Sequence, residues 1–303
     1  MSKFTVFQRN IRDLIPQLEV KEKEAMSQHT SFRIGGGAEL MAFPKNEEEL
    51  SSLLKMSREM DIPYVILGAG TNVLAPDAGM ECLVICLKDC LGGMERIGDT
   101  SIRVYAGVTM SRAAVFAASL NLGGLEFAHG IPGTIGGGVY MNAGAYGGEI
   151  KDVCRRVKIM EPDGTTRWIE GEELGFSYRH SAMEDHPWIV VAADFELVSR
   201  PEAEVKEKML ELIGKRRASQ PLDLPSAGSA FKRPVGGYAA ALIDQAGLKG
   251  YQVGGAAIST KHAGFAVNMG GATAEDVKSL LKQVSDIVYE KSGIRLEPEV
   301  RIW

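Results

Sequence analysis

Two repeating patterns of apolar and polar positions run along this chain, and they predict helices interspersed with strands throughout. Apolar side chains spaced three and four residues apart are typical of a helix with one buried face, and short apolar or alternating runs are typical of strands. The spacing predicts helices over residues 46–60, 111–120, 202–217, 239–246 and 273–291. It predicts strands over residues 64–67, 82–87, 103–106, 188–198 and 294–302, and a β-hairpin over residues 157–169.

Polar and glycine signals mark where several of these elements begin and end. Asn46 followed by Glu49 resembles a capping box at the start of a helix, and Ser111 is predicted to cap the alanine-rich helix after it. The pair Asp163-Gly164 is typical of a hairpin turn. Gly293 follows the longest apolar-periodic segment and is predicted to end that helix.

The chain has 303 residues, which exceeds one typical hydrophobic core, so we expect two or three subdomains. The mixture of helices and strands predicts an α+β portion up to about residue 200 and a smaller α/β portion from about residue 201 to 290. The Ser-Arg-Pro segment at 199–201 is the predicted hinge.

Charge and hydropathy exclude several classes of function. The net charge of −5 argues against nonspecific nucleic-acid binding. No apolar run reaches the ~18 residues of a membrane span, and the polar first 24 residues lack the apolar core of a signal peptide. The sequence therefore predicts a cytoplasmic protein with neither a nucleic-acid partner nor a membrane partner.

The four cysteines do not predict a metal site. Cys82, Cys86 and Cys90 are four residues apart, but they fall in a β-rich segment, and a strand holds residues at that spacing far apart. Cys154 is remote in sequence, and neither a Cys-x-x-Cys pair nor a histidine partner is nearby. We therefore expect free thiols in a reducing compartment and no bound metal.

The densest chemical signal is a glycine-rich segment. Ten of the residues from Gly123 to Gly148 are glycine, and the segment contains neither Lys nor Arg. Glycine permits a positive φ and lets backbone N–H groups approach a ligand closely, as a phosphate requires. Apolar residues within the segment can pack, so it predicts an ordered loop against a flat ligand that carries phosphates, most naturally a nucleotide cofactor. A tight corner in which backbone packs on backbone is the alternative.

A second glycine turn follows the predicted strand at 64–67. Its sequence is Gly68-Ala69-Gly70-Thr71-Asn72. It is not a Rossmann fingerprint, because the third glycine is absent and Pro76 prevents a long helix, and it is not a P-loop, which requires Gly-Lys-Ser or Gly-Lys-Thr. By itself the segment is a plain turn; together with the first it favours a cofactor site.

Three polar groups of residues lie outside these loops. Arg179, within Tyr-Arg-His-Ser, could hold a carboxylate in a bidentate fork, or it could be a surface residue in a turn. Ser229 lies in a segment with Lys232 and Arg233, which combines a hydroxyl donor with two cations or forms a solvated loop. Glu297 and Glu299 flank Pro298 on one face of the predicted terminal strand, which is also typical of a protected edge.

Several short motifs in a fixed order carry a family resemblance. Together they resemble the bacterial UDP-N-acetylenolpyruvylglucosamine reductases (UDP-N-acetylmuramate dehydrogenases, the MurB family) of cell-wall synthesis, over about residues 28 to 301. The span between Arg179 and Trp188 is short, as in the shorter, type II form of the family, which lacks an inserted tyrosine-bearing loop. The motifs are Thr30-Ser-Phe-Arg-Ile-Gly-Gly36, Leu67-Gly-Ala-Gly-Thr-Asn-Val-Leu74, Gly130-Ile-Pro-Gly-Thr-Ile-Gly-Gly-Gly138, Asn142-Ala-Gly-Ala-Tyr-Gly-Gly-Glu149, Tyr178-Arg-His-Ser181, Gly228-Ser-Ala-Phe-Lys-Arg-Pro234 and Leu296-Glu-Pro-Glu-Val300.

The resemblance implies an α+β fold with a two-part FAD-binding domain of the vanillyl-alcohol-oxidase (PCMH) type and a smaller α/β substrate-binding domain. The implied ranges are 1–90 and 91–200 for the two FAD-binding subdomains and 201–303 for the substrate domain, whose C-terminal strand returns to the active site. It also implies noncovalent FAD, NADPH as cosubstrate, a UDP-sugar substrate and no obligate protein partner. The implied cofactor-binding residues are Arg33, Gly68, Ala69, Gly70, Thr71, Asn72, Gly133, Thr134, Ile135, Gly136, Gly137, Asn142, Ala143 and Gly144.

The family's catalytic residues correspond to Arg179, Ser229 and Glu299. In the implied reaction, NADPH reduces FAD, and hydride then moves from flavin N5 to the terminal carbon of the enolpyruvyl group, which places negative charge on the carboxylate. Arg179 and a protonated Glu299 would stabilise this enediolate, and Ser229 would protonate the α carbon. Lys232 either helps Ser229 lose its proton or binds a phosphate.

The substrate diphosphate requires cations, and the sequence offers candidates whose alternative is a solvated basic face. They are Arg216, Arg217, Lys232, Arg233 and Lys261. Two other functions share this architecture: an oxidase that tethers its flavin through His29 or His129, and a flavin- or nucleotide-binding regulator without turnover. A pure binding module has no need for the three catalytic motifs.

Overall fold

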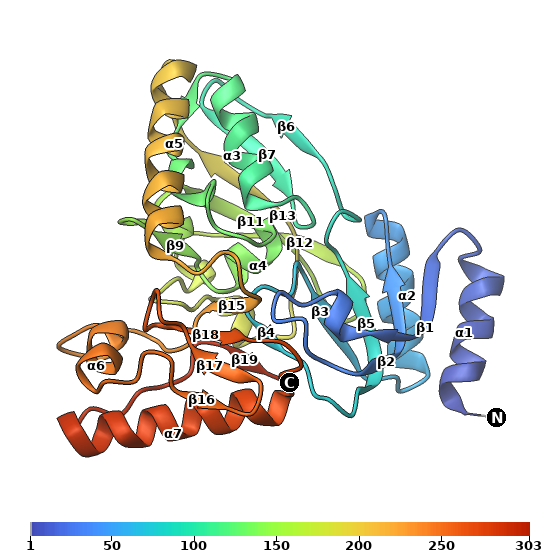
Figure 1. The fold of residues 1–303 in the computed structure, drawn as a ribbon. Helices are drawn as coiled ribbons and strands as arrows, with labels where there is room; N and C mark the ends of the chain where they lie inside the picture. Colours follow the sequence, from blue (N-terminus) through green and yellow to red (C-terminus); the bar gives the residue numbers. More distant parts are fainter. Residues whose placement is uncertain (1) are drawn as a thin grey trace. The chain divides into compact units, whose positions relative to one another are not determined.

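A computed structural model describes residues 2–303, and helices and strands are interspersed throughout this range (Figure 1). None of the helices in this range is long and apolar enough to span a bilayer. The α-helices are α1 (Lys3–Leu14), α2 (Glu47–Glu59), α3 (Met110–Ser119), α4 (Ile135–Tyr140), α5 (Glu202–Ser219), α6 (Ala239–Gln245) and α7 (Ala274–Ser292).

The strands form three larger sheets and three two-stranded pairs. One sheet has the order β1 (Glu19–Ala25), β2 (Gly37–Phe43), β5 (Met80–Cys86), β3 (Tyr64–Leu67). A second has the order β12 (Thr166–Glu170), β11 (Cys154–Met160), β13 (Ile189–Glu196), β7 (Ser101–Tyr105), β6 (Met94–Arg96). The third has the order β15 (Ser226–Ser229), β18 (Phe265–Asn268), β17 (Ala256–Ile258), β16 (Gln252–Val253). The pairs join β9 (Gly144–Ala145) to β10 (Gly148–Glu149), β8 (Leu122–Gly123) to β14 (Val198–Ser199), and β4 (Val73–Leu74) to β19 (Arg301–Ile302).

The chain divides into two compact units, each built from several segments. The first unit contains residues 2–22, Leu40–Ala69 and Cys82–Gly214. The second contains Lys23–Glu39, Gly70–Glu81 and Lys215–Trp303. The three domain ranges expected from the sequence stay a prediction. The two compact units have different boundaries from these ranges, because Lys23–Glu39 and Gly70–Glu81 belong to the same unit as the C-terminal segment.

Most predicted elements are present, with two differences at helix starts. Asn46 does cap α2, its side chain accepting a hydrogen bond from the Glu49 amide at 2.9 Å. However, the Glu49 carboxylate accepts from the Lys45 backbone amide and the Asn46 side-chain amide, and not from the Asn46 backbone amide, so the capping box is incomplete. The predicted cap Ser111 is wrong: α3 begins one residue earlier, and Thr109 accepts from the Arg112 amide at 3.3 Å.

The predicted terminal strand is shorter than its alternating pattern suggests. Only β19 is a strand, and it pairs in parallel with β4. Before it, Pro298 makes an isolated bridge to Phe231, and the Glu299 amide donates to the Ala230 carbonyl at 2.9 Å. The Arg301 amide donates instead to the Asn72 carbonyl at 3.0 Å, so the segment is divided between two short pairings where the pattern predicted one continuous ladder.

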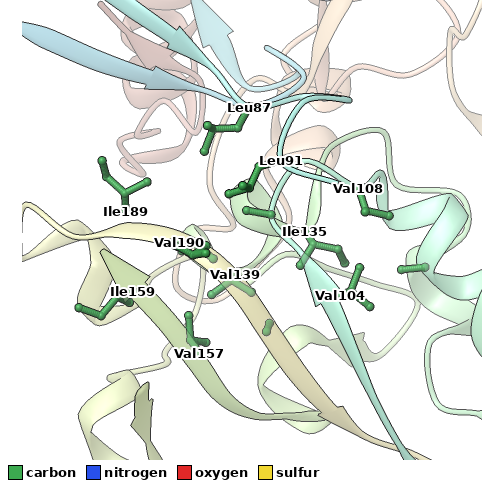
Figure 2. Close-up of a cluster of buried hydrophobic side chains, with 14 of the residues drawn as sticks. Leu87, Leu91, Val104, Val108, Ile135, Val139, Val157, Ile159, Ile189 and Val190 are labelled. Atoms are coloured by element: carbon green, nitrogen blue, oxygen red, sulfur yellow. The ribbon is translucent and has the colours of Figure 1, made fainter. Parts of the chain in front are cut away.

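The core of the first unit explains why a glycine-rich sequence forms α4. Ile135 and Val139 are four residues apart on one face of this helix, and both are fully buried. Each glycine in a helix costs about 1 kcal/mol relative to alanine. Burying each aliphatic side chain contributes roughly 1.5–3 kcal/mol, which offsets that cost. Figure 2 shows the surrounding side chains, each at most 5% exposed: Leu87, Leu91, Val104, Val108, Val157, Ile159, Ile189 and Val190.

In the second unit, α7 lies along the sheet that contains β16 and β17 (Figure 1). Its N-cap Thr273 and Asp276 form a complete capping box, and Gly293 ends it with a φ of 71°. The Asp77 carboxylate also accepts from the Ala274 amide at 2.9 Å. This cap ties the chain after β4 to the start of α7.

A buried carboxylate is expected to stabilise the five-stranded sheet of the first unit. Asp194, 3% exposed, accepts from Arg103 at 2.7 and 3.0 Å and from Arg156 at 2.7 Å, and both guanidinium groups lie over Trp168. We expect Asp194→Ala to lower the free energy of unfolding by about 2 kcal/mol, because two partly covered cations lose their partner. Urea unfolding measures this. Glu95→Ala, which removes an exposed partner of Arg103, is the matched control and should cost less than about 1 kcal/mol; equal losses would contradict the assignment.

Candidate active site

The predicted phosphate loop at 130–138 is only partly a loop, because α4 begins within it. Thr134 is the N-cap of α4, and its hydroxyl accepts from the Gly137 amide at 3.3 Å. The Ile135 and Gly136 amides donate to the Val108 and Ala106 carbonyls at 2.8 and 2.9 Å. The Gly133 and Thr134 amides make no recorded hydrogen bond to an acceptor within residues 2–303. The backbone donors available to a ligand therefore lie at 133–134.

Two neighbouring glycines in α4 have different reasons to be glycine. A Cβ at Gly136 would lie 3.0 Å from the Ala106 Cβ, so the protein itself excludes a side chain there. A Cβ at Gly137 would lie 3.6 Å from the Thr134 hydroxyl and meet nothing closer outside its own helix, and Gly137 is exposed. The fold therefore tolerates a side chain at 137, and a closely approaching ligand would explain its absence. The surface at Gly137 is therefore the candidate cradle for a cofactor.

We expect Gly137→Ala to separate folding from cofactor binding. The added methyl should raise the stability of the unliganded protein by roughly 0.5–1 kcal/mol through helix propensity. It should weaken FAD binding by about 10- to 100-fold, because overpacking a close contact costs roughly 1–3 kcal/mol. Flavin fluorescence during titration of the apoprotein measures this. Gly214→Ala in α5, where a Cβ meets nothing within 4 Å, is the matched control; equal FAD affinity in both variants would contradict the cradle.

The second glycine turn is shaped by close backbone packing. In the first unit, a Cβ at Gly68 would lie 2.6 Å from the Thr134 hydroxyl, so Gly68 and Ala69 run beside the start of α4. In the second unit, Gly70 has a φ of 61°, and a Cβ there would lie 2.1 Å from the His29 carbonyl. After Thr71, the Asn72 side chain donates to the Glu299 carbonyl at 3.1 Å.

Arg33 lies beside Gly70 in the second unit. Its amide closes a turn with the Thr30 carbonyl at 3.1 Å, and its φ is 56°. The same segment is attached to the glycine turn by the Ser31 amide, which donates to the Gly70 carbonyl at 3.0 Å. The Arg33 side chain is exposed.

Arg179 lies in a tight turn of the first unit. The Ser177 and His180 backbones exchange hydrogen bonds at 3.1 and 3.3 Å, and Arg179 between them has a φ of 54°. Its guanidinium donates to the Gly144 carbonyl at 3.0 Å and lies over the Tyr178 ring, 5.2 Å from the centroid. One of its five donors is thus fixed by the β9–β10 hairpin.

The predicted cofactor residue Asn142 has its side chain committed to the protein. It is fully buried and donates to the Glu149 carboxylate at 2.6 Å and to the Ser177 carbonyl at 2.8 Å. Its oxygen accepts from the Lys151 amide at 3.0 Å. Ala143, at 5% exposure, is also buried. Both N–H donors of the Asn142 side chain are therefore committed to the protein, which leaves it no donor for a cofactor.

Ser229 and Glu299 are held on neighbouring backbone segments of the second unit. Ser229 pairs with Phe265 of β18, and the next residue, Ala230, accepts from the Glu299 amide at 2.9 Å. Gly228, with a φ of 75°, precedes Ser229 at a bulge in β15. Ser229 is exposed, and its hydroxyl makes no recorded hydrogen bond within residues 2–303. The predicted catalytic residues are thus divided between the units, with Arg179 in the first.

The predicted phosphate-binding cations all lie in the second unit. Lys232 faces the exposed Glu297 at 3.6 Å, and Arg233 lies over the Tyr238 ring at 3.9 Å. Lys261 donates to the Arg217 carbonyl at 2.7 Å, which brings it to the end of α5, one residue beyond Arg216. Lys261 thus has a structural role at a helix C-terminus as well.

The thiols are free, in agreement with the sequence. Burial raises the pKa of Cys82, Cys86 and Cys154, and it raises the pKa of Cys90 to about 11. Protonated thiols are poor metal ligands and poor nucleophiles. Within residues 2–303 no group of three or more His, Cys, Asp or Glu side chains could hold a metal ion.

Sequence reasoning missed the supports of the Arg179 turn. Ser181 is fully buried, and its hydroxyl donates to the Tyr140 carbonyl at 2.7 Å. Ser177 supplies the carbonyl that Asn142 binds. Ser181 belongs to the Tyr-Arg-His-Ser motif and Ser177 precedes it, but nothing in the sequence indicates that Ser181 is buried or that Ser177 contacts Asn142.

Comparisons with known proteins cover nearly the whole chain. The family described as "FAD binding domain" matches residues 38–170, and "UDP-N-acetylenolpyruvoylglucosamine reductase, C-terminal domain" matches residues 220–303. The UDP-N-acetylenolpyruvoylglucosamine reductase of Agathobacter rectalis is 43% identical, over 98% of each chain. The crystal structure of UDP-N-acetylenolpyruvylglucosamine reductase from Thermus caldophilus is 36% identical, with a TM-score of 0.81, and the match covers 94% of this chain and 99% of that one.

A distant likeness bears on the fold alone. A structure of alkyldihydroxyacetonephosphate synthase is 14% identical, with a TM-score of 0.50, over 64% of this chain and 40% of that one. Together with the FAD-binding-domain match, it confirms the predicted fold class: α+β, with an FAD-binding domain of the vanillyl-alcohol-oxidase type.

Proposed function

This chain belongs to the UDP-N-acetylenolpyruvoylglucosamine reductase family, and from that membership we propose that it reduces UDP-N-acetylglucosamine enolpyruvate to UDP-N-acetylmuramate. The reaction is a step of peptidoglycan precursor synthesis, and NADPH is the proposed source of the hydride. The observation that carries the proposal is the exposed Ser229 hydroxyl, without a recorded protein partner, on a backbone hydrogen-bonded to the Glu299 segment. A flavin-binding module without turnover gives no reason for that arrangement.

FAD, when bound, supplies the redox chemistry by accepting hydride from NADPH and passing it to the enolpyruvyl double bond. The residues proposed to hold FAD are the glycine turn at 68–72, the start of α4 at 133–137, the backbone at 143–144, and Arg33. The Gly133 and Thr134 amides are the proposed phosphate donors, and Gly137 lets the cofactor approach α4 closely. Ile135 and Gly136 shape this surface without donating, since their amides already donate to the Val108 and Ala106 carbonyls, respectively.

Arg179 and Glu299 are proposed to stabilise the charge that develops on the substrate. Addition of hydride to the terminal carbon converts the C=CH₂ group into a methyl-bearing carbanion, and its electron pair spreads into the carboxylate as an enediolate. Arg179 supplies a permanent cation with fixed donors, one of which Gly144 already orients. Glu299, in its protonated form, donates to the second carboxylate oxygen. Preorganised donors of this kind act most strongly where charge appears only in the transition state.

Ser229 is proposed to complete the reaction by protonating the α carbon. The proton moves from the serine hydroxyl to the carbanion, the new C–H bond takes up the enediolate electron pair, and solvent returns a proton to the serine oxygen. A hydroxyl is a weak acid, but an enediolate carbon is strongly basic, so position matters more than acidity. Lys232 is proposed to assist in one of two ways: it helps Ser229 lose its proton by stabilising the serine alkoxide, or it binds a phosphate of the substrate.

A steady-state assay tests the proposed activity. The purified chain should oxidise NADPH only when the enolpyruvyl UDP-sugar is present, and the product should carry a lactyl ether. Acid precipitation should release all the flavin to the supernatant, because the proposed cofactor is noncovalent. NADPH oxidation that does not depend on the UDP-sugar, or flavin that stays with the precipitate, would contradict the proposal and favour an oxidase.

A further inference from the structure

We propose that Asn142 is a positioning residue whose side chain fixes the turn that carries Arg179. The inference rests on the proposed role of Arg179 and deepens it, because it names the group that sets where this guanidinium lies. It also reassigns Asn142 from the cofactor to the turn.

The first observation is that Asn142 joins three backbone segments at once. Its amide nitrogen donates to Glu149 on β10 and to the Ser177 carbonyl, while its oxygen accepts from the Lys151 amide. The side chain is fully buried, so water cannot replace a lost bond cheaply. An amide is required here, because no other side chain of this size offers two donors and an acceptor together.

The second observation is that the backbone at 142 also suits asparagine. Its φ is 45°, in the left-handed region that asparagine and aspartate enter more readily than other non-glycine residues. The chain turns there from α4 into the β9–β10 hairpin. One residue therefore redirects the backbone and connects the hairpin to the turn at 177–180.

The third observation is that the turn is attached to the same segment at two further points. The buried Ser181 hydroxyl donates to the Tyr140 carbonyl at 2.7 Å, and Arg179 itself donates to the Gly144 carbonyl at 3.0 Å. Tyr140 and Gly144 thus lie on either side of Asn142, and all three bonds hold the turn to this one segment. Arg179 has a φ of 54°, a conformation that persists only when its surroundings enforce it.

The proposed consequence is kinetic. A guanidinium that must meet a developing carboxylate charge works only within a narrow range of positions. Loss of the Asn142–Ser177 bond should let the turn shift while the arginine stays present and charged. Steps that do not involve Arg179, including flavin binding and flavin reduction by NADPH, should be unaffected.

Asn142→Asp is the sharpest test, because aspartate keeps the size and the left-handed preference but cannot donate to Ser177. We expect reoxidation of the flavin by the enolpyruvyl UDP-sugar to slow by about 10- to 100-fold, with flavin reduction by NADPH changed by less than about two-fold. The double variant Asn142→Asp with Glu149→Gln reverses the donor and acceptor between 142 and 149. It should recover part of the lost thermal stability but not the reoxidation rate, because the Ser177 carbonyl still lacks its donor.

Ser181→Ala provides a second route if the Asn142 variants fold poorly. It removes one hydrogen bond from the same turn and should slow reoxidation in the same selective way. Normal reoxidation in Asn142→Asp, or its full recovery in the double variant, would overturn the inference. Arg179→Ala separates a failure of this inference from a failure of the proposed role of Arg179. If Arg179→Ala slows reoxidation and Asn142→Asp does not, only the positioning role of Asn142 is wrong. If Arg179→Ala has no effect, the role of Arg179 and the positioning role of Asn142 are both wrong.

Discussion

Ser229→Ala is expected to leave flavin reduction by NADPH fast while slowing flavin reoxidation by the enolpyruvyl UDP-sugar by at least about 10²- to 10³-fold. The two half-reactions separate in this way because the hydroxyl takes part only in the second one, where protonation of the enediolate draws the hydride transfer to completion. A lost proton donor and electrostatic contact of this kind is worth roughly 3–4 kcal/mol of transition-state stabilisation, and 1.36 kcal/mol corresponds to a factor of ten.

The structure makes this substitution a mild one for folding. Ser229 is exposed at the end of β15, and its hydroxyl has no recorded partner within residues 2–303, so its removal breaks no such contact. The backbone bonds that hold the segment, from the Ala230 amide to Gly264 and from the Glu299 amide to Ala230, do not involve the side chain. A large loss of rate in Ser229→Ala would therefore reflect chemistry.

Ser226→Ala is the matched control for Ser229→Ala, because it removes a second hydroxyl from the same strand. Stopped-flow absorbance follows both half-reactions in each variant. If Ser229→Ala reoxidised its flavin at the rate of Ser226→Ala, Ser229 would not be the proton donor.

Arg179→Ala should produce the second-largest effect, about a 10²-fold loss in the rate of reoxidation, with little change in flavin reduction. The guanidinium is proposed to meet charge that forms on the substrate carboxylate, and loss of one such donor typically costs about 10²–10³ in kcat. The substrate KM should also rise, because the carboxylate is already negative in the ground state and loses part of its binding.

Arg179→Lys distinguishes the geometry of the guanidinium from its charge. Lysine keeps the charge but not the planar fork, so it should recover only part of the lost rate. Arg58→Ala, an exposed arginine at the end of α2, controls for the loss of a surface cation and should match the wild type. Full activity in Arg179→Lys would assign the residue a purely electrostatic role, and full activity in Arg179→Ala would remove it from the mechanism.

The elements of this fold were largely predictable because their signals are local. The long helix α7 has apolar side chains at helical spacing, a capping box at Thr273 and Asp276, and a left-handed Gly293 after its end. Each signal involves residues within a few positions, so sequence alone identifies it. The hairpin of β11 and β12 was predictable for the same reason, since Gly164 at its turn adopts a φ of 81°.

Other features depend on contacts that are remote in sequence, and these could not be predicted. The alternating pattern at 294–302 gives only a short strand because its pairing is divided between Phe231 and β4. Thr109 and Ser111 can both cap a helix. Thr109 is the observed cap of α3, and it also forms a β-bridge with Thr134, a contact 25 residues away that the local sequence does not indicate. The commitment of Asn142 to Ser177 joins residues 35 positions apart.

The candidate site shows the same division. The glycines at 68–72 and 133–138 are visible as a composition, but only coordinates distinguish Gly136, which the protein itself requires, from Gly137, which it does not. The division of the predicted catalytic residues between the two units also has no signal in sequence, because residues 23–39 and 70–81 join the C-terminal segment only through folding.

An anaerobic absorbance cycle on the purified holoprotein tests the central claim most directly. The flavin band should bleach when NADPH is added and return when the enolpyruvyl UDP-sugar follows, in the absence of oxygen. In Ser229→Ala the band should bleach equally fast and stay bleached on the same time scale. A chain that carries no flavin, or a bleached band that only oxygen restores in the wild type, would contradict the account.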